Sequence, residues 1–174
     1  MTLRKLEMKD APFMLEWMHD PNVTIGLQKE FGEKTLADCE EFIAYANRTS
    51  LDIHMAVADD NDEYMGTVSL KNISNGSAEF AVAVRSCAMG KGFSRFAMAE
   101  IIRIGFEKLG LENIYWYVLK DNLRAIKFYD KNGYVRINEF LKKDKSFLEY
   151  APVPCAEEQS ESFIWYLAEN HCHN

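Results

Sequence analysis

Two helices in the first third of the chain are predicted by apolar residues that recur with helical spacing. The first is expected over residues 10–18, starting at an aspartate N-cap, and Asp-Pro-Asn at residues 20–22 predicts its end. The second is expected over residues 35–46, where Thr-Leu-Ala-Asp has the form of a capping box. The apolar stripe of the first helix consists of Phe13, Met14, Trp17 and Met18.

Two further helices are predicted in the second half of the chain. The longer is expected over residues 93–109, and Gly110 directly after it has the position of a C-terminal stop. The shorter is expected over residues 123–132, with Asn122 as its N-cap and Gly133 after its end. The apolar positions of the longer helix are Phe93, Ala97, Ile101, Ile104 and Leu109.

Strands are predicted where apolar residues alternate with polar ones, or run together, between turn residues. The runs at 53–58 and 64–71 are separated by Asp-Asp-Asn-Asp, which favours an antiparallel hairpin. This acidic turn lacks the spacing, glycine and terminal glutamate of a calcium loop. A turn is expected at 72–76, and a loop at 142–161, where Pro-containing, charged sequence replaces the periodic pattern. The remaining strands are expected over residues 3–8, 78–84, 113–118, 134–141 and 162–168.

The predicted order of elements is β-α-α-β-β-β-α-β-α-β-β. Strand runs cluster in the middle of the chain and helices separate them on either side, which favours an α/β fold with a mixed sheet and helices on both faces. The 174 residues suffice for one domain with a core and are too few for two ordinary ones, so residues 1–174 are expected to form a single domain.

Composition narrows the class of protein. Hydrophobic residues make up 48% and charged residues 27%, as in globular proteins, and no apolar run approaches the roughly 20 residues of a membrane span. The net charge of −7 disfavours a nucleic-acid binder and is compatible with a cationic amine as substrate. The N-terminal residues have no signal-peptide core, which predicts a cytoplasmic protein.

The cysteines and histidines do not predict a metal site. Cys39, Cys87, Cys155 and Cys172 form no Cys-x-x-Cys pair, so free thiols are expected. The terminal His-Cys-His at residues 171–173 would need one or two further ligands to bind zinc, and chain ends are usually frayed. We therefore expect no metal.

The strongest candidate for a binding site is the sequence Met-Gly-Lys-Gly-Phe-Ser at residues 89–94, between a predicted strand and the long helix. Glycines allow the backbone to approach a ligand closely, and a helix N-terminus presents unsatisfied N–H groups that suit a phosphate. The alternative is a plain strand-to-helix turn. A P-loop requires a different glycine and lysine spacing, and a dinucleotide fingerprint requires a glycine where this chain has Arg95.

A second motif follows the next strand. In the segment from Asn122 to Tyr134, residues Asn122, Ala125, Tyr129, Gly133 and Tyr134 match the pattern Asn-x-x-Ala-x-x-x-Tyr-x-x-x-Gly-Phe/Tyr. Together with the glycine motif, it resembles the GNAT acetyltransferase superfamily, and the order of elements is similar over nearly the whole chain. Ala78-Glu79-Phe80 and Asn138-Glu139-Phe140 are similar to the branch of ribosomal-protein and spermidine acetyltransferases.

The resemblance implies a single-domain fold with a mostly antiparallel sheet in which the fourth and fifth strands splay apart. Acetyl-CoA would be the co-substrate, with its pantetheine arm between the splayed strands like an added strand. The backbone of Val82, Ala83 and Val84 would bind the arm. The pyrophosphate would lie against Met89, Gly90, Lys91, Gly92, Phe93 and Ser94, with Lys91 and Arg95 as charge partners. Asn122, Ala125 and Phe128 would line the other side.

Two catalytic roles are also implied. Tyr129 would protonate the departing thiolate of the coenzyme, although a phenol at such a position is otherwise typical of a half-buried core aromatic. Glu79 would accept the proton of the amine, directly or through water, with an ordinary surface carboxylate as the alternative. His19 and Glu30 are further candidates for the base, and His54 is most simply a strand residue.

Three departures from the family pattern affect the coenzyme site. Met89 replaces the usual Arg or Gln, Ser94 replaces the final Gly or Ala, and the segment 85–88 lacks a proline. We expect weaker coenzyme binding at worst, because backbone N–H groups make most of the contact.

The resemblance implies transfer of acetyl to a primary amine by direct attack. The amine could belong to a polyamine, an amino sugar, an amino acid or a protein N-terminus, and the loop at 142–161 would shape the acceptor site or a homodimer contact. The alternatives are a non-catalytic acyl-CoA-binding regulatory module and a nucleotide-binding fold.

Overall fold

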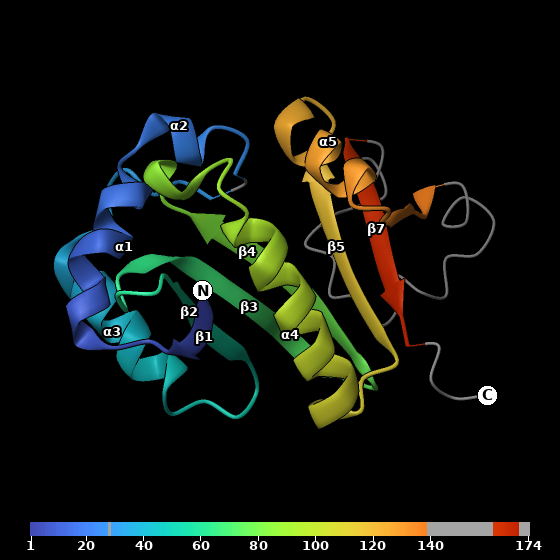
Figure 1. Ribbon diagram of the computed structural model, residues 1–174, viewed down its shortest axis with the longest axis horizontal. Helices are drawn as coiled ribbons and strands as arrows, with labels where there is room; N and C mark the ends of the chain where they lie inside the picture. The colour runs from blue at the N-terminus through green and yellow to red at the C-terminus, as the bar shows by residue number, and fades with distance from the viewer. Residues whose placement is uncertain (28, 139–161, 171–174) are drawn as a thin grey trace. The chain divides into compact units, whose positions relative to one another are not determined.

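The computed structural model describes residues 1–27, 29–138 and 162–170 (Figure 1). It divides into two compact units. The first unit comprises residues 1–71 and 81–101, and the second comprises residues 72–80 and 102–174. No helix in the described ranges is long and apolar enough to cross a membrane.

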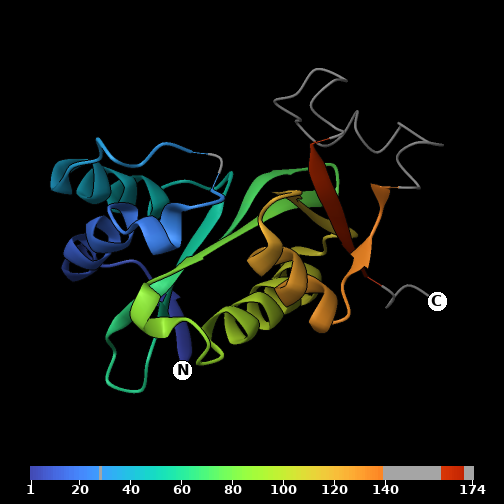
Figure 2. The same cartoon turned by 90° about the horizontal axis from the view of Figure 1, so that it is seen from above.

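The first unit contains three antiparallel strands and the helices that cover them. Strand β1 (Thr2–Lys5) pairs with β2 (Ile53–Ala58), and β2 pairs with β3 (Tyr64–Ser74). The helices α1 (Ala11–Met18), α2 (Pro21–Thr24) and α3 (Leu36–Ala46) gather on the same side of these strands (Figure 2). Their apolar faces form one core, which includes Leu6, Met14, Trp17, Ile43, Ala56 and Tyr64.

The helix starts of the first unit follow from hydrogen bonds that the sequence encodes. The hydroxyl of Thr35 accepts from the backbone of Asp38, whose carboxylate accepts in turn from the backbone of Thr35 at 2.8 Å, so the predicted capping box is confirmed. Asp20-Pro21-Asn22 does more than end α1. The Asp20 carboxylate accepts from the Asn22 backbone at 2.8 Å and Pro21 occupies the first turn, which starts the short helix α2.

The second unit is built around β5 (Asn113–Leu119). The first half of β4 (Ser77–Val84) pairs parallel to β5, whereas β7 (Phe163–Glu169) pairs antiparallel to β5, and β6 (Val135–Arg136) pairs antiparallel to β7. Helix α5 (Leu123–Lys131) lies beside β5 and β7 (Figure 1). The strand order is β1-β2-β3-β4-β5-β7-β6, which confirms the mixed, mostly antiparallel sheet of the predicted fold class. Helix α4 (Phe93–Leu109) has the predicted bounds.

Three predicted boundaries are wrong. The first strand, expected over residues 3–8, ends at Lys5, and Met8 belongs to the 3-10 helix Met8–Asp10. Strand β3 continues to Ser74, so the turn consists of Asn75 and Gly76, both with positive φ, instead of residues 72–76. The predicted strand 134–141 is a strand only at Val135–Arg136 among the described residues. The reason lies at Asn138, whose side-chain amide bonds the Phe163 carbonyl at 2.8 Å and the Trp165 N–H at 2.9 Å, in place of backbone pairing. The predicted loop 142–161 and the terminal His-Cys-His lie outside the described residues.

Gly66 on β3 offers a test of the packing in the first unit. A Cβ at this position would lie 2.4 Å from the Ala83 carbonyl oxygen and 2.9 Å from the Val84 Cα. Because both neighbours are backbone atoms, Gly66→Ala should lower the free energy of unfolding in urea by about 1–3 kcal/mol. Gly32→Ala is the matched control, since a Cβ there would meet nothing within 4 Å. Equal effects of the two substitutions would contradict this account.

Candidate active site

The segment from residue 86 to residue 94, here called the glycine loop, connects β4 to α4 in the first unit. Gly90 has a φ of 73° and Gly92 a φ of 89°, a backbone conformation that other residues rarely adopt. A Cβ at Gly90 would meet nothing within 4 Å, and one at Gly92 would meet only the Met1 side chain at 4.0 Å. Both glycines are therefore required for backbone conformation, which turns the chain tightly into the helix.

The start of α4 presents backbone donors at the end of this loop. Phe96 donates the first intrahelical hydrogen bond, to the Gly92 carbonyl at 3.0 Å. The N–H groups of the three residues before Phe96 precede that bond, as the first N–H groups of any helix do. Lys91 and Arg95 are exposed at the same turn. Backbone donors, the positive end of a helix dipole and two cations together suit a pyrophosphate.

Met89, the unusual first residue of the glycine motif, has a packing role. Its side chain packs against the apolar core of the first unit, and the preceding Ala88 is 1% exposed. Met89 thus anchors the loop to the core, a packing role that the match to the family pattern does not reveal. A polar contact to the phosphates and a packing contact to the core are different uses of the same position.

The second half of β4 carries the residues expected to bind the pantetheine arm. Among the described residues, the register of β4 with β5 comprises three pairs and ends at Glu79 and Tyr115. The Arg85 N–H donates to the Met65 carbonyl on β3 at 2.9 Å, and backbone groups of successive strand residues point to opposite edges. The backbone groups of Val82 and Val84 therefore point away from β3, whereas those of Ala83, also expected to bind the arm, point toward β3.

Tyr129 lies on α5 in the second unit and is 6% exposed. Its ring centroid is 5.0 Å from that of Tyr166, 5.1 Å from Phe128 and 5.3 Å from Trp116. Burial among these rings raises the pKa of Tyr129, with smaller contributions from neighbouring tyrosines. The phenol is therefore protonated at neutral pH, as a proton donor must be.

Several residues of the second motif build the helix that carries Tyr129. The Asn122 carboxamide accepts from the Ala125 backbone at 3.1 Å and caps the helix start. Gly133 ends the helix with a φ of 80°, and Tyr134 donates from its backbone to the Tyr129 carbonyl at 3.2 Å. The motif fixes the position of Tyr129, and direct coenzyme contacts of Asn122 and Ala125 stay a prediction.

Glu79 occupies the opposite face of the second unit's sheet. Its register partner Tyr115 shares its face, whereas the next residue, Phe80, packs against Trp116 with ring centroids 5.5 Å apart. Trp116 belongs to the cluster around Tyr129. The two candidate catalytic groups therefore belong to opposite faces, and Glu79 stands at the last residue pair before the pairing of β4 with β5 ends.

The Glu79 carboxylate is half-buried and held in place. It accepts a hydrogen bond from the Asn72 side chain at 3.0 Å. Burial raises the pKa of the neighbouring Tyr115, and the charge of Glu79 adds to the effect. An ionised carboxylate is an acceptor with two oxygens, so it can in principle take up a proton or bind a water molecule.

The other candidate bases lie in the first unit. His19 makes a 2.9 Å hydrogen bond through its Nε2 to the Lys34 carbonyl. His54 is buried on β2, its Nδ1 is 2.7 Å from the Ser69 hydroxyl, and burial lowers its pKa, so the imidazole is neutral at pH 7. Glu30 lines a surface hollow together with Gly32, Glu33, Lys34 and Asp38. Within the described residues no three His, Cys, Asp or Glu side chains could hold a metal ion.

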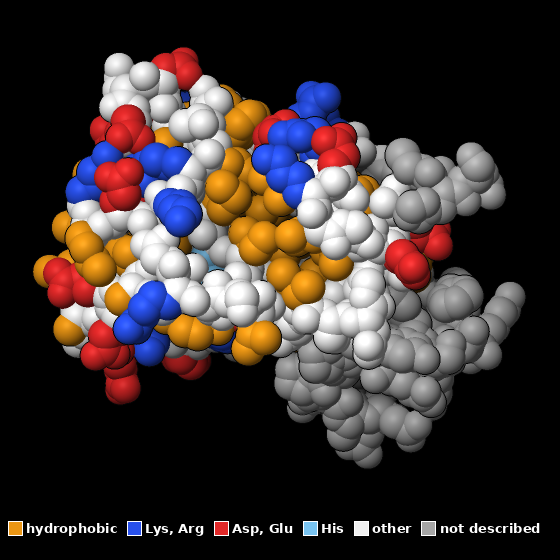
Figure 3. All heavy atoms as spheres, turned by 90° about the horizontal axis from the view of Figure 1, so that it is seen from below, with side chains coloured by type: hydrophobic (Ala, Val, Ile, Leu, Met, Phe, Trp, Pro, Cys, Tyr) orange, Lys and Arg blue, Asp and Glu red, His pale blue; other side chains and the backbone are white. Residues whose placement is uncertain are grey.

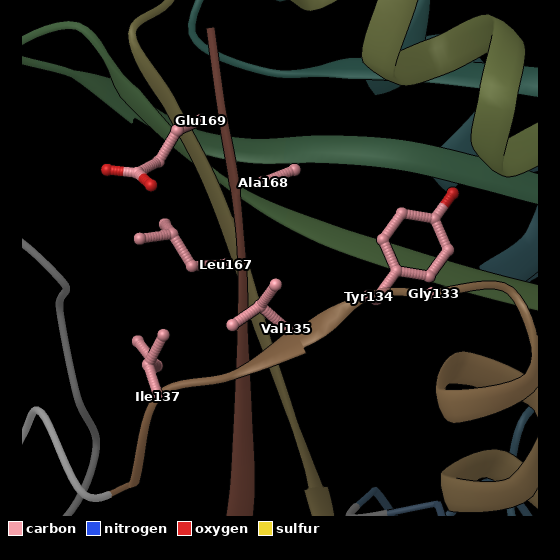
Figure 4. A pocket seen from close by; sticks show the side chains of 7 residues that line it. All are labelled: Gly133, Tyr134, Val135, Ile137, Leu167, Ala168 and Glu169. Atoms are coloured by element: carbon pink, nitrogen blue, oxygen red, sulfur yellow. The ribbon is translucent and has the colours of Figure 1, made fainter. Parts of the chain in front are cut away.

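A second hollow lies at the edge of the second unit, between β6 and β7 (Figure 4). None of the predicted site residues lines it. Its walls are formed by Gly133, Tyr134, Val135, Ile137, Leu167, Ala168 and Glu169. On the face drawn in Figure 3, Lys and Arg side chains lie near Asp and Glu side chains, with hydrophobic side chains exposed among them.

Comparisons with known proteins agree with this geometry. The family described as Acetyltransferase (GNAT) domain matches residues 1–135. Acetyltransferase PseH of Campylobacter jejuni is 26% identical, over 82% of this chain and 85% of its own. Spermidine N(1)-acetyltransferase of Vibrio cholerae is 27% identical, over 82% and 83% of the two chains. A crystal structure of spermidine N-acetyltransferase from Vibrio cholerae with CoA and spermine matches with a TM-score of 0.70 and 27% identity, over 78% of this chain and 80% of the other.

The matched family region contains the glycine loop, Glu79 and the helix of Tyr129, and CoA is bound in the structural relative. Backbone N–H groups at a helix start and a protonated phenol are features that suit acyl transfer from a coenzyme thioester. The chain belongs to the GNAT acetyltransferase family and is an acyltransferase that moves an acetyl group from acetyl-CoA to an amine.

Proposed function

We propose that a small primary amine attacks acetyl-CoA directly, with Glu79 as the base and Tyr129 as the acid. One observation carries this assignment: the two groups lie on opposite faces of the same sheet, and Glu79 marks the point where the pairing of β4 with β5 ends. A thioester at such a point can be attacked from one face while its sulfur is protonated from the other. The proposal covers residues 1–174 acting as one acetyltransferase domain.

The reaction balances without a covalent enzyme intermediate. The amine nitrogen forms a bond to the thioester carbonyl carbon, and the carbon–sulfur bond breaks. The proton lost by the amine goes to Glu79, directly or through water, and Tyr129 supplies a proton to the departing thiolate. Burial disfavours the tyrosinate that remains, so Tyr129 has to recover its proton before the next turnover.

In the same proposal, each unit contributes its own part of coenzyme binding. In the first unit, the glycine loop and the N–H groups at the start of α4 would bind the pyrophosphate, and the backbone of Val82 and Val84 would bind the pantetheine arm. In the second unit, Phe128 would line the site beside Tyr129. The glycines at 90 and 92 support this arrangement for two reasons. They allow the positive φ values of the loop, and they carry no Cβ that could keep a phosphate away from the backbone.

A cationic amine, with spermidine as the first candidate, is the proposed acceptor. Two observations support it: a relative is named for spermidine, and the surface hollow of the first unit carries the carboxylates of Glu30, Glu33 and Asp38 against one lysine. Opposite charge raises the local concentration of a polycation. We also propose a cytoplasmic location, supported by the free thiols of Cys39 and Cys87. A homodimer remains part of the proposal.

A non-catalytic acyl-CoA-binding module is the alternative function. Such a module would have no use for a buried, protonated phenol beside the coenzyme sulfur. The relatives named acetyltransferases also favour catalysis.

Tyr129→Phe tests the acid. Loss of the proton donor should lower kcat by roughly 10²-fold or more, with little change in the KM of acetyl-CoA, because the ring and its packing remain. The measurement is release of free thiol. Tyr134→Phe removes a hydroxyl from a neighbouring ring and is the control; an equal effect in both variants would argue against the role of Tyr129.

Glu79→Gln tests the base. At neutral pH the variant should lose roughly 10- to 100-fold in kcat/KM for the amine. The deficit should shrink as the pH rises, because the fraction of unprotonated amine increases and less base catalysis is needed. A pH–rate profile of wild type, Glu79→Gln and the surface control Glu112→Gln provides the measurement. A deficit that stays constant with pH would assign Glu79 a structural role.

An amine panel tests the acceptor. Thiol release should be fastest with spermidine and spermine, and slower with amino sugars, amino acids and a peptide with a free N-terminus, because a polycation complements the acidic hollow. Coenzyme A, and neither NAD nor ATP, should raise the melting temperature. Binding of coenzyme A without turnover of any amine would favour the non-catalytic alternative.

A further inference from the structure

Arg85 joins β4 to the glycine loop and is one of the few buried charged residues of the first unit. It is 8% exposed. A buried guanidinium is costly unless charged and polar partners surround it. The local sequence around Arg85 gives no sign of the partners of this side chain, which come from distant parts of the first unit.

Helix α1, the turn between β2 and β3, and the start of β3 provide these partners. Glu16 on α1 accepts two hydrogen bonds, from Nε at 3.1 Å and from Nη2 at 2.9 Å. Nη1 donates to the Glu63 carboxylate at 2.6 Å and to the Tyr64 carbonyl at 3.0 Å. The guanidinium carbon also lies 4.4 Å from the ring centroid of Phe13 on α1. The planar guanidinium therefore binds α1 and the start of β3 at the same time.

The backbone of Arg85 is fixed as firmly as its side chain. Its N–H donates to the Met65 carbonyl at 2.9 Å, and its carbonyl accepts from the Ala88 N–H at 2.9 Å, in the short 3-10 turn Ser86–Ala88. The glycine loop begins at Ser86, the residue directly after Arg85. A shift of Arg85 would therefore move the first turn of the loop, and with it the N–H groups proposed to bind the pyrophosphate.

Arg85 also neutralises charge near that loop. The side chains of Glu16 and Glu63 are 48% and 46% exposed, whereas the side chain of Arg85 is 9% exposed. Without the guanidinium, two carboxylates would remain unpaired beside a loop proposed to bind an anion, and like charges repel. Position and charge thus act in the same direction.

We infer that Arg85 is a positioning residue for coenzyme binding: its bonds to Glu16, Glu63 and Tyr64 hold the glycine loop in the conformation that accepts the pyrophosphate. This inference rests on the proposed function of the loop. Arg85 touches neither the thioester nor the amine in this scheme, so it acts on binding and leaves the chemical step alone.

The test compares two thioesters, acetyl-CoA and S-acetylpantetheine, of which only the first carries the pyrophosphate. Arg85→Lys keeps the charge but cannot bind Glu16, Glu63 and the Tyr64 carbonyl together. It should raise the KM of acetyl-CoA roughly tenfold, with kcat within about twofold of wild type. With S-acetylpantetheine, kcat/KM should equal that of wild type. The dissociation constant of coenzyme A, by calorimetry, should rise by the same factor as KM.

Two further variants keep the test independent of folding. Glu63→Gln weakens one of the hydrogen bonds of the Arg85 guanidinium without altering Arg85 itself. It should raise the KM of acetyl-CoA by a smaller factor than Arg85→Lys. Arg103→Lys changes an exposed arginine that pairs with Glu107 on α4 at 2.9 Å, and should leave both thioesters unaffected. Thermal melting of each variant reports separately on stability.

The possible results separate this inference from the proposed function. Equal losses with both thioesters, or an unchanged KM in Arg85→Lys, would overturn the positioning role and leave the acetyltransferase proposal intact. Failure of the wild-type protein to bind coenzyme A would overturn both. Binding of coenzyme A by the wild type without thiol release, together with weaker binding in Arg85→Lys, would support the positioning role and reject the catalytic proposal.

Discussion

The parallel pairing of β4 with β5 stops after Glu79 and Tyr115, and the proposed use of the site depends on this interruption. Backbone N–H and C=O groups in a sheet need partners, so a strand edge that continues beyond its partner is a place for a ligand with amide groups. Pantetheine is such a ligand. The same interruption leaves Glu79 at the end of the paired segment, where a side chain can reach a group bound along that edge.

The two units contain different parts of the proposed site. The first unit fixes a backbone loop through the core contacts of Met89 and the buried guanidinium of Arg85, and this orients the N–H groups that we propose to bind a phosphate. The second unit buries a phenol among aromatic rings, which keeps it protonated, and places a carboxylate on the other face of the sheet. In the proposed scheme, anion binding and proton transfer are thus assigned to different parts of the chain.

Motif residues have structural duties that a sequence pattern does not reveal. Asn122 caps the helix that carries Tyr129, and Gly133 ends that helix in a left-handed conformation. Gly90 and Gly92 are needed for φ values that other residues avoid. Their proposed role in coenzyme binding would therefore be exerted through backbone geometry, and a pattern match at these positions also reports on the fold.

The type and order of the main elements can be predicted from the sequence, because hydrophobic periodicity, caps and glycine stops are local signals. The bounds of α4 and the capping box of α3 are examples. The sequence also determined the family, since the glycine loop and the Tyr129 motif are short and contiguous. It failed at residues 72–74, where β3 continues through a predicted turn, and at residue 138, where a side chain replaces strand pairing.

Tertiary packing establishes which residues share a face and which distant residues meet. Glu79 and Tyr129 lie on opposite faces because of strand register, which depends on partners more than 30 positions away in the sequence. The side chain of Arg85 bonds to Glu16, 69 positions earlier in the sequence, and to Glu63, 22 positions earlier. Such contacts form only when the chain packs, so no local pattern can encode them. For that reason the hydrogen-bond partners of Arg85 could not be predicted from the sequence.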